Sequence, residues 1–288
     1  MNETTQITPV VGYTAKEGLP VEVRPALGPM VIWGARYSGR TLAARSLFEQ
    51  LAADERTVLA IDGDFAGGGY QRAAHLMGAD SLALVDHRAG EPRRWEELRG
   101  PAVIRGHCIE AYDGCEGNRR FYEATHSLLE SVLSARVMPH LIIDTASELL
   151  HSDEEGWKLL HRIAHASRGC GAMVVVVTHD TNPASVCEED AYFFGPLLGM
   201  SRYILMVGDM SASSNHSKYT ANPLPQAMVR MCGRKRLQPK EALLAEPTGS
   251  FSRIALREDE LHLRGLDLPR PWPEEAGPPP PPPRSWQV

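Results

Sequence analysis

The stretch from Gly34 to Thr41 constrains the fold of this chain more than any other part of the sequence. It reads Gly-Ala-Arg-Tyr-Ser-Gly-Arg-Thr and has the G-x-x-x-x-G-K-[ST] spacing of a phosphate-binding loop, with Arg40 where lysine is usual. An apolar run over 29–33 and an amphipathic pattern over 41–51 predict a strand before the loop and a helix after it. A strand–turn–helix connection that binds no ligand has the same local pattern. The segments after residue 41 are therefore needed to distinguish a phosphate-binding loop from such a turn.

The residue types in this loop suit an anion. The glycines allow successive backbone N–H groups to point at one phosphate, at the positive end of the following helix. Arg40 could reach phosphate oxygens as a planar fork, and a hydroxyl at the next position is placed to ligate Mg²⁺. The candidate binding residues are Gly34, Ser38, Gly39, Arg40 and Thr41, of which Thr41 is also a candidate metal ligand.

Composition excludes several classes of protein. The 288 residues are 43% hydrophobic and 23% charged, which suits one sizeable globular domain with appendages. The net charge of −6 gives no global basic field for collecting nucleic acid, although local basic clusters remain. Five cysteines without a C-x-x-C pair indicate reduced thiols. No apolar run reaches the ~18 residues of a membrane span, so we expect a soluble cytoplasmic protein with no membrane partner.

Three regions follow from the pattern along the chain. Residues 1–28 read as a loose arm with one strand at 19–23, and residues 29–268 as the folded domain. Within that domain, apolar runs alternate with helical segments up to about residue 200, which predicts an α/β fold with a mostly parallel sheet and helices on both faces. Later short runs at 203–207, 226–230, 241–245 and 251–256 predict strands added mostly antiparallel at one edge. The tail at 269–288 contains six consecutive prolines and should be a disordered polyproline II segment, either a spacer or a ligand for a partner's SH3-like or WW-like groove.

Carboxylates and a histidine end three of the predicted strands. Asp144 closes an apolar strand about 100 residues after the loop, where a carboxylate can hold the Mg²⁺ shell opposite Thr41. Asp62 and Asp64 follow the strand after the loop helix, and one of them could polarise an attacking water. His179 follows a valine-rich strand and could sense the terminal phosphate. Each of these residues also has a purely structural interpretation as a turn or strand-end residue.

Basic residues of the late strand region are candidates for a role between subunits. Arg202 and the cluster containing Arg234 and Arg236 could stabilise transition-state charge across an interface, as arginine fingers do. Solvated turns are the structural alternative.

Taken in order, these motifs resemble the RecA-like P-loop ATPases, especially the branch with hexameric replicative and plasmid helicases. The resemblance rests on Gly34–Thr41, residues 58–64, 141–145 and 169–179, and the closing 233–249 segment. It implies ATP and Mg²⁺ as cofactors, hydrolase activity, a homo-oligomer and work on single-stranded nucleic acid or a protein assembly. Residue by residue, it implies a base at Asp64, a sensor at His179 and trans-acting charge at Arg202 or at Arg234 and Arg236. The chain departs from the family pattern at Arg40, where the family has lysine. This difference affects the expectation of hydrolysis more than that of nucleotide binding.

A second resemblance shares two of these segments. Residues 58–64 and 141–145 are also similar to ParA/MinD-type partition ATPases, although that family has an additional lysine early in its loop, where this chain has Ala35 and Arg36. The late strand region also fits that family less well. The function hypotheses are therefore a RecA-like ATPase, a partition ATPase, and an inactive pseudo-ATPase that serves as a scaffold.

Overall fold

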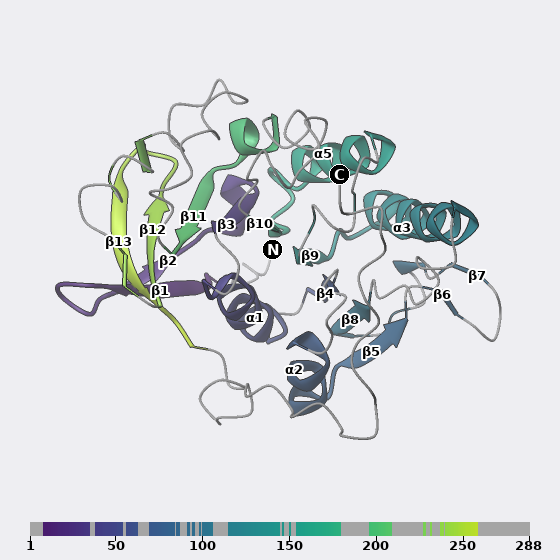
Figure 1. Cartoon of the computed structure of the whole chain (residues 1–288), viewed down its shortest axis with the longest axis horizontal. Coiled ribbons are helices and arrows are strands. Elements are labelled where there is room, and N and C mark those ends of the chain that lie inside the picture. Colours follow the sequence, from purple (N-terminus) through teal and green to yellow (C-terminus); the bar gives the residue numbers. More distant parts are fainter. Residues whose placement is uncertain are drawn as a thin grey trace, which may run out of the picture.

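A mixed β-sheet with helices on both faces forms the centre of the molecule (Figure 1). The computed structural model describes residues 8–34, 38–53, 56–62, 69–83, 85–86, 91–92, 94–95, 98, 100–105, 115–144, 146, 150, 154–179, 196–208, 227–228, 231, 237–238 and 240–258. The strands of the main sheet are β1 (Val10–Thr14), β2 (Pro20–Glu22), β3 (Met30–Gly34), β4 (Val58–Asp62), β5 (Asp80–Ala83), β8 (Ala102–Arg105), β9 (His140–Asp144), β10 (Val174–His179), β11 (Tyr203–Val207), β12 (Glu241–Ala245) and β13 (Phe251–Leu256). The helices are α1 (Arg40–Leu51), α2 (Gly69–Met77), α3 (Cys115–Ser134) and α5 (Glu154–Ala166), with a 3₁₀ turn η1 (Pro25–Leu27). A separate ribbon pairs β6 (Val85–Asp86) with β7 (Glu91–Pro92).

The sheet has a parallel centre and an antiparallel extension. Within the described ranges its strand order is β2-β1-β13-β12-β11-β3-β10-β9-β4-β8-β5. Every pair from β11 to β5 is parallel, whereas the pairs among β11, β12, β13, β1 and β2 are antiparallel. The predicted α/β class, with a mostly parallel sheet and an antiparallel edge, is confirmed.

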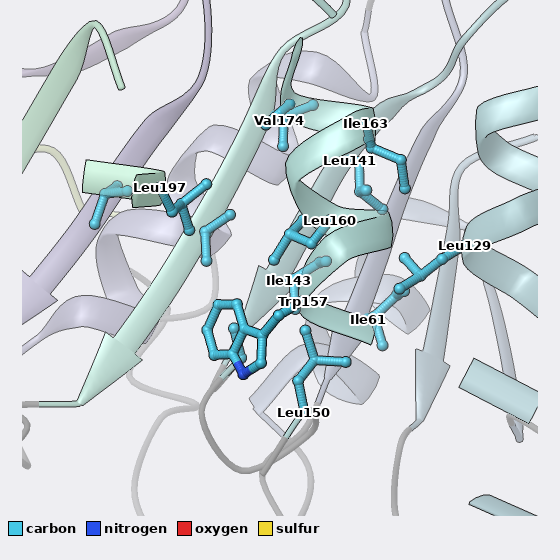
Figure 2. Packing of buried hydrophobic residues seen from close by; sticks show 14 of the residues in the cluster. Ile61, Leu129, Leu141, Ile143, Leu150, Trp157, Leu160, Ile163, Val174 and Leu197 are labelled. Carbon is cyan, nitrogen blue, oxygen red and sulfur yellow. The ribbon is translucent and has the colours of Figure 1, made fainter. Parts of the chain in front are cut away.

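Two hydrophobic cores lie on opposite faces of this sheet, because successive side chains of a strand point to opposite sides. On β9, Leu141 and Ile143 join the core under α3 and α5, while Ile142 joins the core under α1 and α2. The two helix pairs lie on either side of the sheet in Figure 1. Figure 2 shows Trp157 of α5 packed beside Ile143 and Leu150 on the first face.

The first 28 residues differ from the sequence prediction. One strand was expected there, and the structure has two. β2 matches the predicted strand, and β1 pairs antiparallel with both β2 and β13 at the end of the sheet. Val11 and Val23 are buried in the core of the α1 and α2 face. Sequence reasoning missed β1 because its Val-Val-Gly-Tyr-Thr sequence has no polar–apolar alternation.

Two further differences concern the middle and late regions. β8, between β4 and β5, was not predicted. The strand predicted at 226–230 is wrong, because Ala227 and Met228 have helical conformation. A short apolar run is compatible with either state, and Met228 reaches the core from a helix.

The proline-rich tail predicted at 269–288 falls outside the described residues. Among the helices that the structure describes, none combines the length and apolar character needed to cross a membrane.

Candidate functional site

The Gly34–Thr41 segment lies at the carboxyl edge of the parallel strands. Gly34 is the last residue of β3, and α1 begins at Arg40 after a turn that brings the helix N-terminus to this edge. The N-cap residue Gly39 has a φ of 101°, a left-handed conformation that strongly favours glycine. The predicted strand–turn–helix arrangement is therefore present, and the N–H groups of the first turn of α1 face the sheet edge.

Close contacts explain why glycines are needed around this turn. A Cβ atom on Gly34 would lie 2.2 Å from the carbonyl oxygen of Val207 on the neighbouring strand β11. A Cβ atom on Gly208, whose φ is 80°, would lie 2.7 Å from the Cβ of Ser38. The loop thus packs against the end of β11 with no room for side chains at these two positions.

The side chain of Arg40 turns into the protein. Arg40 is 8% exposed, and its Nη1 donates a hydrogen bond to the backbone carbonyl oxygen of Thr178 near the end of β10. β10 lies between β3 and β9, so this contact joins the start of α1 to the strand that separates the loop from Asp144. A guanidinium group has five N–H donors, so this hydrogen bond leaves donors for a phosphate.

Two buried carboxylates end neighbouring strands at the same edge. Asp62 closes β4 and Asp144 closes β9, and the two residues are register partners. Each aspartate lies two residues after a residue of the core under α1 and α2, Ala60 on β4 and Ile142 on β9. Since residues two apart on a strand point to the same side, both aspartates point to the face covered by α1 and α2. Asp62 is 4% and Asp144 2% exposed.

Side chains from both covering helices meet these carboxylates. Arg45 of α1 is 3% exposed, and Tyr70 of α2 is fully buried. Burial raises the pKa of the Tyr70 hydroxyl well above its ordinary value, and the negative charges of Asp144 and Asp62 raise the pKa further, partly opposed by Arg45. Asp144, Asp62 and Arg45 are therefore close enough to Tyr70 for their charges to act on its phenol group. The cluster contains two carboxylates, a guanidinium and a neutral phenol.

The residues present fit a phosphate group with a divalent cation. The Ser38 hydroxyl oxygen is buried and meets no hydrogen-bond partner among the described residues, at a helix N-terminus where an anion would supply an acceptor. Gly34 and Gly208 keep the same space free of side chains. Hydroxyl and carboxylate oxygens such as those of Thr41 and Asp144 are the ligands that Mg²⁺ prefers. No group of three or more histidine, cysteine or acidic residues suited to a metal ion occurs in the described part of the chain, so a cation here would need phosphate or water ligands as well.

The structure brings some predicted residues to this edge and leaves others elsewhere. The backbone of His179 pairs with Gly34 at the end of β10, which is the predicted sensor position, but its side chain lies outside the described residues. Asp64, Arg234 and Arg236 also lie outside them. Arg202 lies just before β11 and is exposed. Its backbone N–H donates to the carbonyl oxygen of Pro29, which precedes β3, so Arg202 lies at the amino edge of the sheet, opposite the Gly34–Thr41 segment.

Sequence reasoning missed several residues of the site: Arg45, Tyr70, Thr178 as an acceptor, and Gly208. The one available signal was the position of Arg45 one helical turn after Thr41, on the apolar side of α1. The others depend on which strands and helices become neighbours.

Comparison with known proteins finds solved structures that share this architecture. No protein-family model matches the sequence, and no curated protein matches it. The fold is similar to VirB4 of Thermoanaerobacter pseudethanolicus, with a TM-score of 0.65, 11% identity, and 88% of this chain and 97% of that chain covered. It is also similar to the cytoplasmic domain of the type VII secretion ATPase EccC of Thermomonospora curvata, with a TM-score of 0.56, 10% identity, and 89% of this chain and 27% of that chain covered.

A viral protein has the same fold. The genome-packaging NTPase B204 of Sulfolobus turreted icosahedral virus 2, solved with AMP, aligns with a TM-score of 0.51 and 13% identity, covering 82% of this chain and all of that chain. At these identities the likeness concerns the fold. The chain shares the fold of these proteins, and its Gly34–Thr41 segment occupies the carboxyl edge of the parallel sheet, where a strand-to-helix phosphate loop is expected.

Proposed function

We propose that this protein is an ATP-binding P-loop NTPase of the RecA-like kind. It uses nucleotide binding or hydrolysis to do work on nucleic acid or on a protein assembly, as a cytoplasmic homo-oligomer. The observation that carries the proposal is the convergence of the glycine-bounded N-terminus of α1 with Asp62 and Asp144, which end paired strands at the same edge of the sheet.

Each residue then has a defined task. The first-turn N–H groups of α1 and the Ser38 hydroxyl bind phosphate oxygens, and the remaining donors of Arg40 neutralise their charge. Thr41 and Asp144 would hold Mg²⁺, which neutralises charge on the transferring phosphoryl group. Asp64 acts on the attacking water, and His179 reports the presence of the terminal phosphate to β10. Arg202, Arg234 and Arg236 act on a neighbouring subunit.

A scaffold without turnover is the second candidate. It is favoured by the Arg40 side chain, which is buried and hydrogen-bonded to Thr178. If that contact persists with nucleotide bound, Arg40 contributes no charge to a developing phosphoryl transition state, and the site binds without hydrolysing. A partition ATPase of the ParA/MinD kind stays a further alternative.

The first test combines a nucleotide-binding titration with a steady-state ATPase assay. Arg40→Ala should weaken ATP binding by about 1.5–3 kcal/mol, the range for a hydrogen bond to a charged group, while Arg40→Lys should preserve it. Arg162→Ala is the matched control, because Arg162 is exposed on α5 of the opposite helical layer. Unchanged affinity in folded Arg40→Ala would show that the loop is not a phosphate cradle.

The same assays separate the two candidates. Wild-type binding with turnover supports the NTPase, binding without turnover supports the scaffold, and absence of binding contradicts both. The nature of the target needs a second measurement. Binding of single-stranded DNA that falls steeply with salt concentration would identify nucleic acid, since counterion release dominates such complexes. Salt-independent or absent DNA binding would favour a protein assembly.

A further inference from the structure

Tyr70 is a buried polar residue of the site that the proposed function leaves without a task. It is the second residue of α2, and its side chain is fully buried. Its ring packs edge-on against Phe48 of α1, with the ring centroids 6.1 Å apart and an interplanar angle of 86°. The ring therefore occupies a defined position between the two helices that cover this face of the sheet.

The hydroxyl group of Tyr70 lies beside the carboxylates. Asp144 acts on it both through its charge and as a nearby hydrogen-bond acceptor, and Asp62 and Arg45 act on it through their charges. Asp144 does not meet strict hydrogen-bond geometry with it, and no other described residue does.

The Tyr70 hydroxyl group can only donate to a carboxylate oxygen. A phenol is protonated at neutral pH, and an ionised carboxylate has no hydrogen to donate. Packing alone does not call for this donor. Phenylalanine would fill the same space against Phe48 without burying a hydroxyl group, which is unfavourable unless that group gains a partner.

We propose that Tyr70 is a positioning residue for Asp144. Its O–H donates to one carboxylate oxygen, which fixes the rotation of the carboxylate and leaves the other oxygen for the hydrated Mg²⁺ of the nucleotide site. The inference rests on the proposed function, because it assigns the role of Tyr70 within the same site. Groups that hydrogen-bond to a metal ligand orient that ligand without touching the metal.

The test measures how much Mg²⁺ the protein needs to bind ATP tightly. Tyr70→Phe removes one oxygen atom and keeps the ring, so the Mg²⁺ concentration for half-maximal tightening of ATP binding should rise about tenfold. ATP binding in the presence of a chelator should be unchanged. Tyr203→Phe is the matched control. Tyr203 is also buried, and its hydroxyl oxygen accepts a hydrogen bond from the backbone N–H of Arg24 at the amino edge of the sheet. Removing the Tyr203 hydroxyl group should therefore leave the Mg²⁺ requirement unchanged.

A double-mutant cycle tests the contact itself. In the nucleotide-free protein, the shifts in urea midpoint caused by Tyr70→Phe and Asp144→Ala should not add, because each removes one partner of the same hydrogen bond. In the Asp144→Ala background, Tyr70→Phe should have no further effect on the Mg²⁺ requirement. Additive midpoint shifts, or an unchanged Mg²⁺ requirement in a Tyr70→Phe protein that binds ATP, would overturn the role of Tyr70 and leave the proposed function standing. A wild-type protein that binds no nucleotide would instead overturn the proposed function, and this inference with it.

Discussion

Arginine side chains in the described part of the chain repeatedly donate hydrogen bonds to backbone carbonyls near strand ends. Arg40 donates to Thr178, Arg168 to Met200, and Arg56 to both Met138 and Cys170. A guanidinium group can satisfy a buried carbonyl and still present other donors in fixed directions. A lysine at position 40 has one compact ammonium group, so it cannot spread donors in this planar geometry. The arginine at position 40 therefore joins the start of α1 to β10, which lysine could not do while presenting further donors in the same plane.

At the residue scale, the first prediction concerns the end of β3. Gly34→Ala should lower the free energy of unfolding by at least about 1–3 kcal/mol, because its Cβ would lie 2.2 Å from a backbone oxygen that cannot move without disturbing β11. Gly199→Ala is the control, since a Cβ there meets nothing within 4 Å and alanine favours its helical conformation. Urea denaturation checks both variants. Equal stability of Gly34→Ala and wild type would contradict the close packing of the loop on β11.

The second residue-scale prediction is a pH dependence. The pKa of Tyr70 in the folded chain is well above 10.0, whereas in the unfolded chain it is about 10. Above pH 10 the folded state therefore binds a proton that the unfolded state has lost, and stability falls as pH rises, by up to about 1.4 kcal/mol per pH unit. Below pH 10 both states are protonated, so Tyr70 adds no slope. Denaturant midpoints from pH 8 to 11 should fall less steeply for Tyr70→Phe than for wild type, and parallel curves would refute the shift.

At the scale of elements, the antiparallel extension connects the start of the chain to helix α1. The side chain of Gln50 in α1 pairs with the backbone of Val10 in both directions, at 2.8 Å to the N–H and 3.0 Å to the carbonyl oxygen. The amide group of Gln50 thus makes the two backbone hydrogen bonds that a neighbouring strand would otherwise make with Val10. β1 is thus held by hydrogen bonds to α1 as well as by its pairing with β13, and β2 is held by its pairing with β1.

This arrangement predicts different effects for two residues of the same hairpin. Val11→Ala should lower the free energy of unfolding by about 2 kcal/mol, from lost burial and the cavity left behind, because Val11 is 3% exposed. Leu19→Ala should change it by less than about 0.5 kcal/mol, because Leu19 is 55% exposed. Thermal or urea unfolding measures both. Indistinguishable small effects would mean that the first strands are not part of the cooperative sheet.

At the scale of the whole molecule, the two edges of the parallel sheet separate the candidate residues. Gly34 and Asp144 lie at the carboxyl edge, and Arg202 at the amino edge of β11. Five strand residues, at about 3.3 Å each, place these edges roughly 17 Å apart. Arg202 therefore cannot reach phosphate bound to its own chain, and any action on phosphate must cross to another subunit.

Mixed oligomers test this division of labour. An Arg202→Ala or Arg236→Ala variant mixed with an Asp64→Ala variant should regain part of the ATPase activity that each lacks alone, because some interfaces then combine an intact base with an intact arginine. Each arginine variant by itself should lose turnover and keep its affinity for ATP, since a charge supplied in trans acts mainly in the transition state. No recovery in mixtures shown to co-assemble, or full activity of a strict monomer, would remove the trans-acting role.

Periodic local patterns account for the parts of the fold that were predicted. The runs that became β4, β9 and β10 have continuous apolar centres, because both faces of a central parallel strand are covered. The runs of two or three apolar residues in β1, β8 and 226–230 do not by themselves distinguish a strand from a helix or a loop. The turn at Gly34–Thr41 and the strand end at Asp144 could be predicted from spacing, whereas the sequence of the helix that contains Tyr70 indicates only an amphipathic helix.

The sequence by itself determined the strand–turn–helix around Gly34–Thr41, the two strand-end aspartates, and the α/β class, because each depends on residues close together in the chain. The tertiary structure decided that β10 separates β3 from β9, and therefore that Arg40 meets Thr178. It also brought Arg45 and Tyr70 against Asp62 and Asp144, by laying α1 and α2 on one face of the sheet. Local pattern fixes which face of an element is apolar, but the choice of partner for that face is made by packing among segments far apart in the sequence.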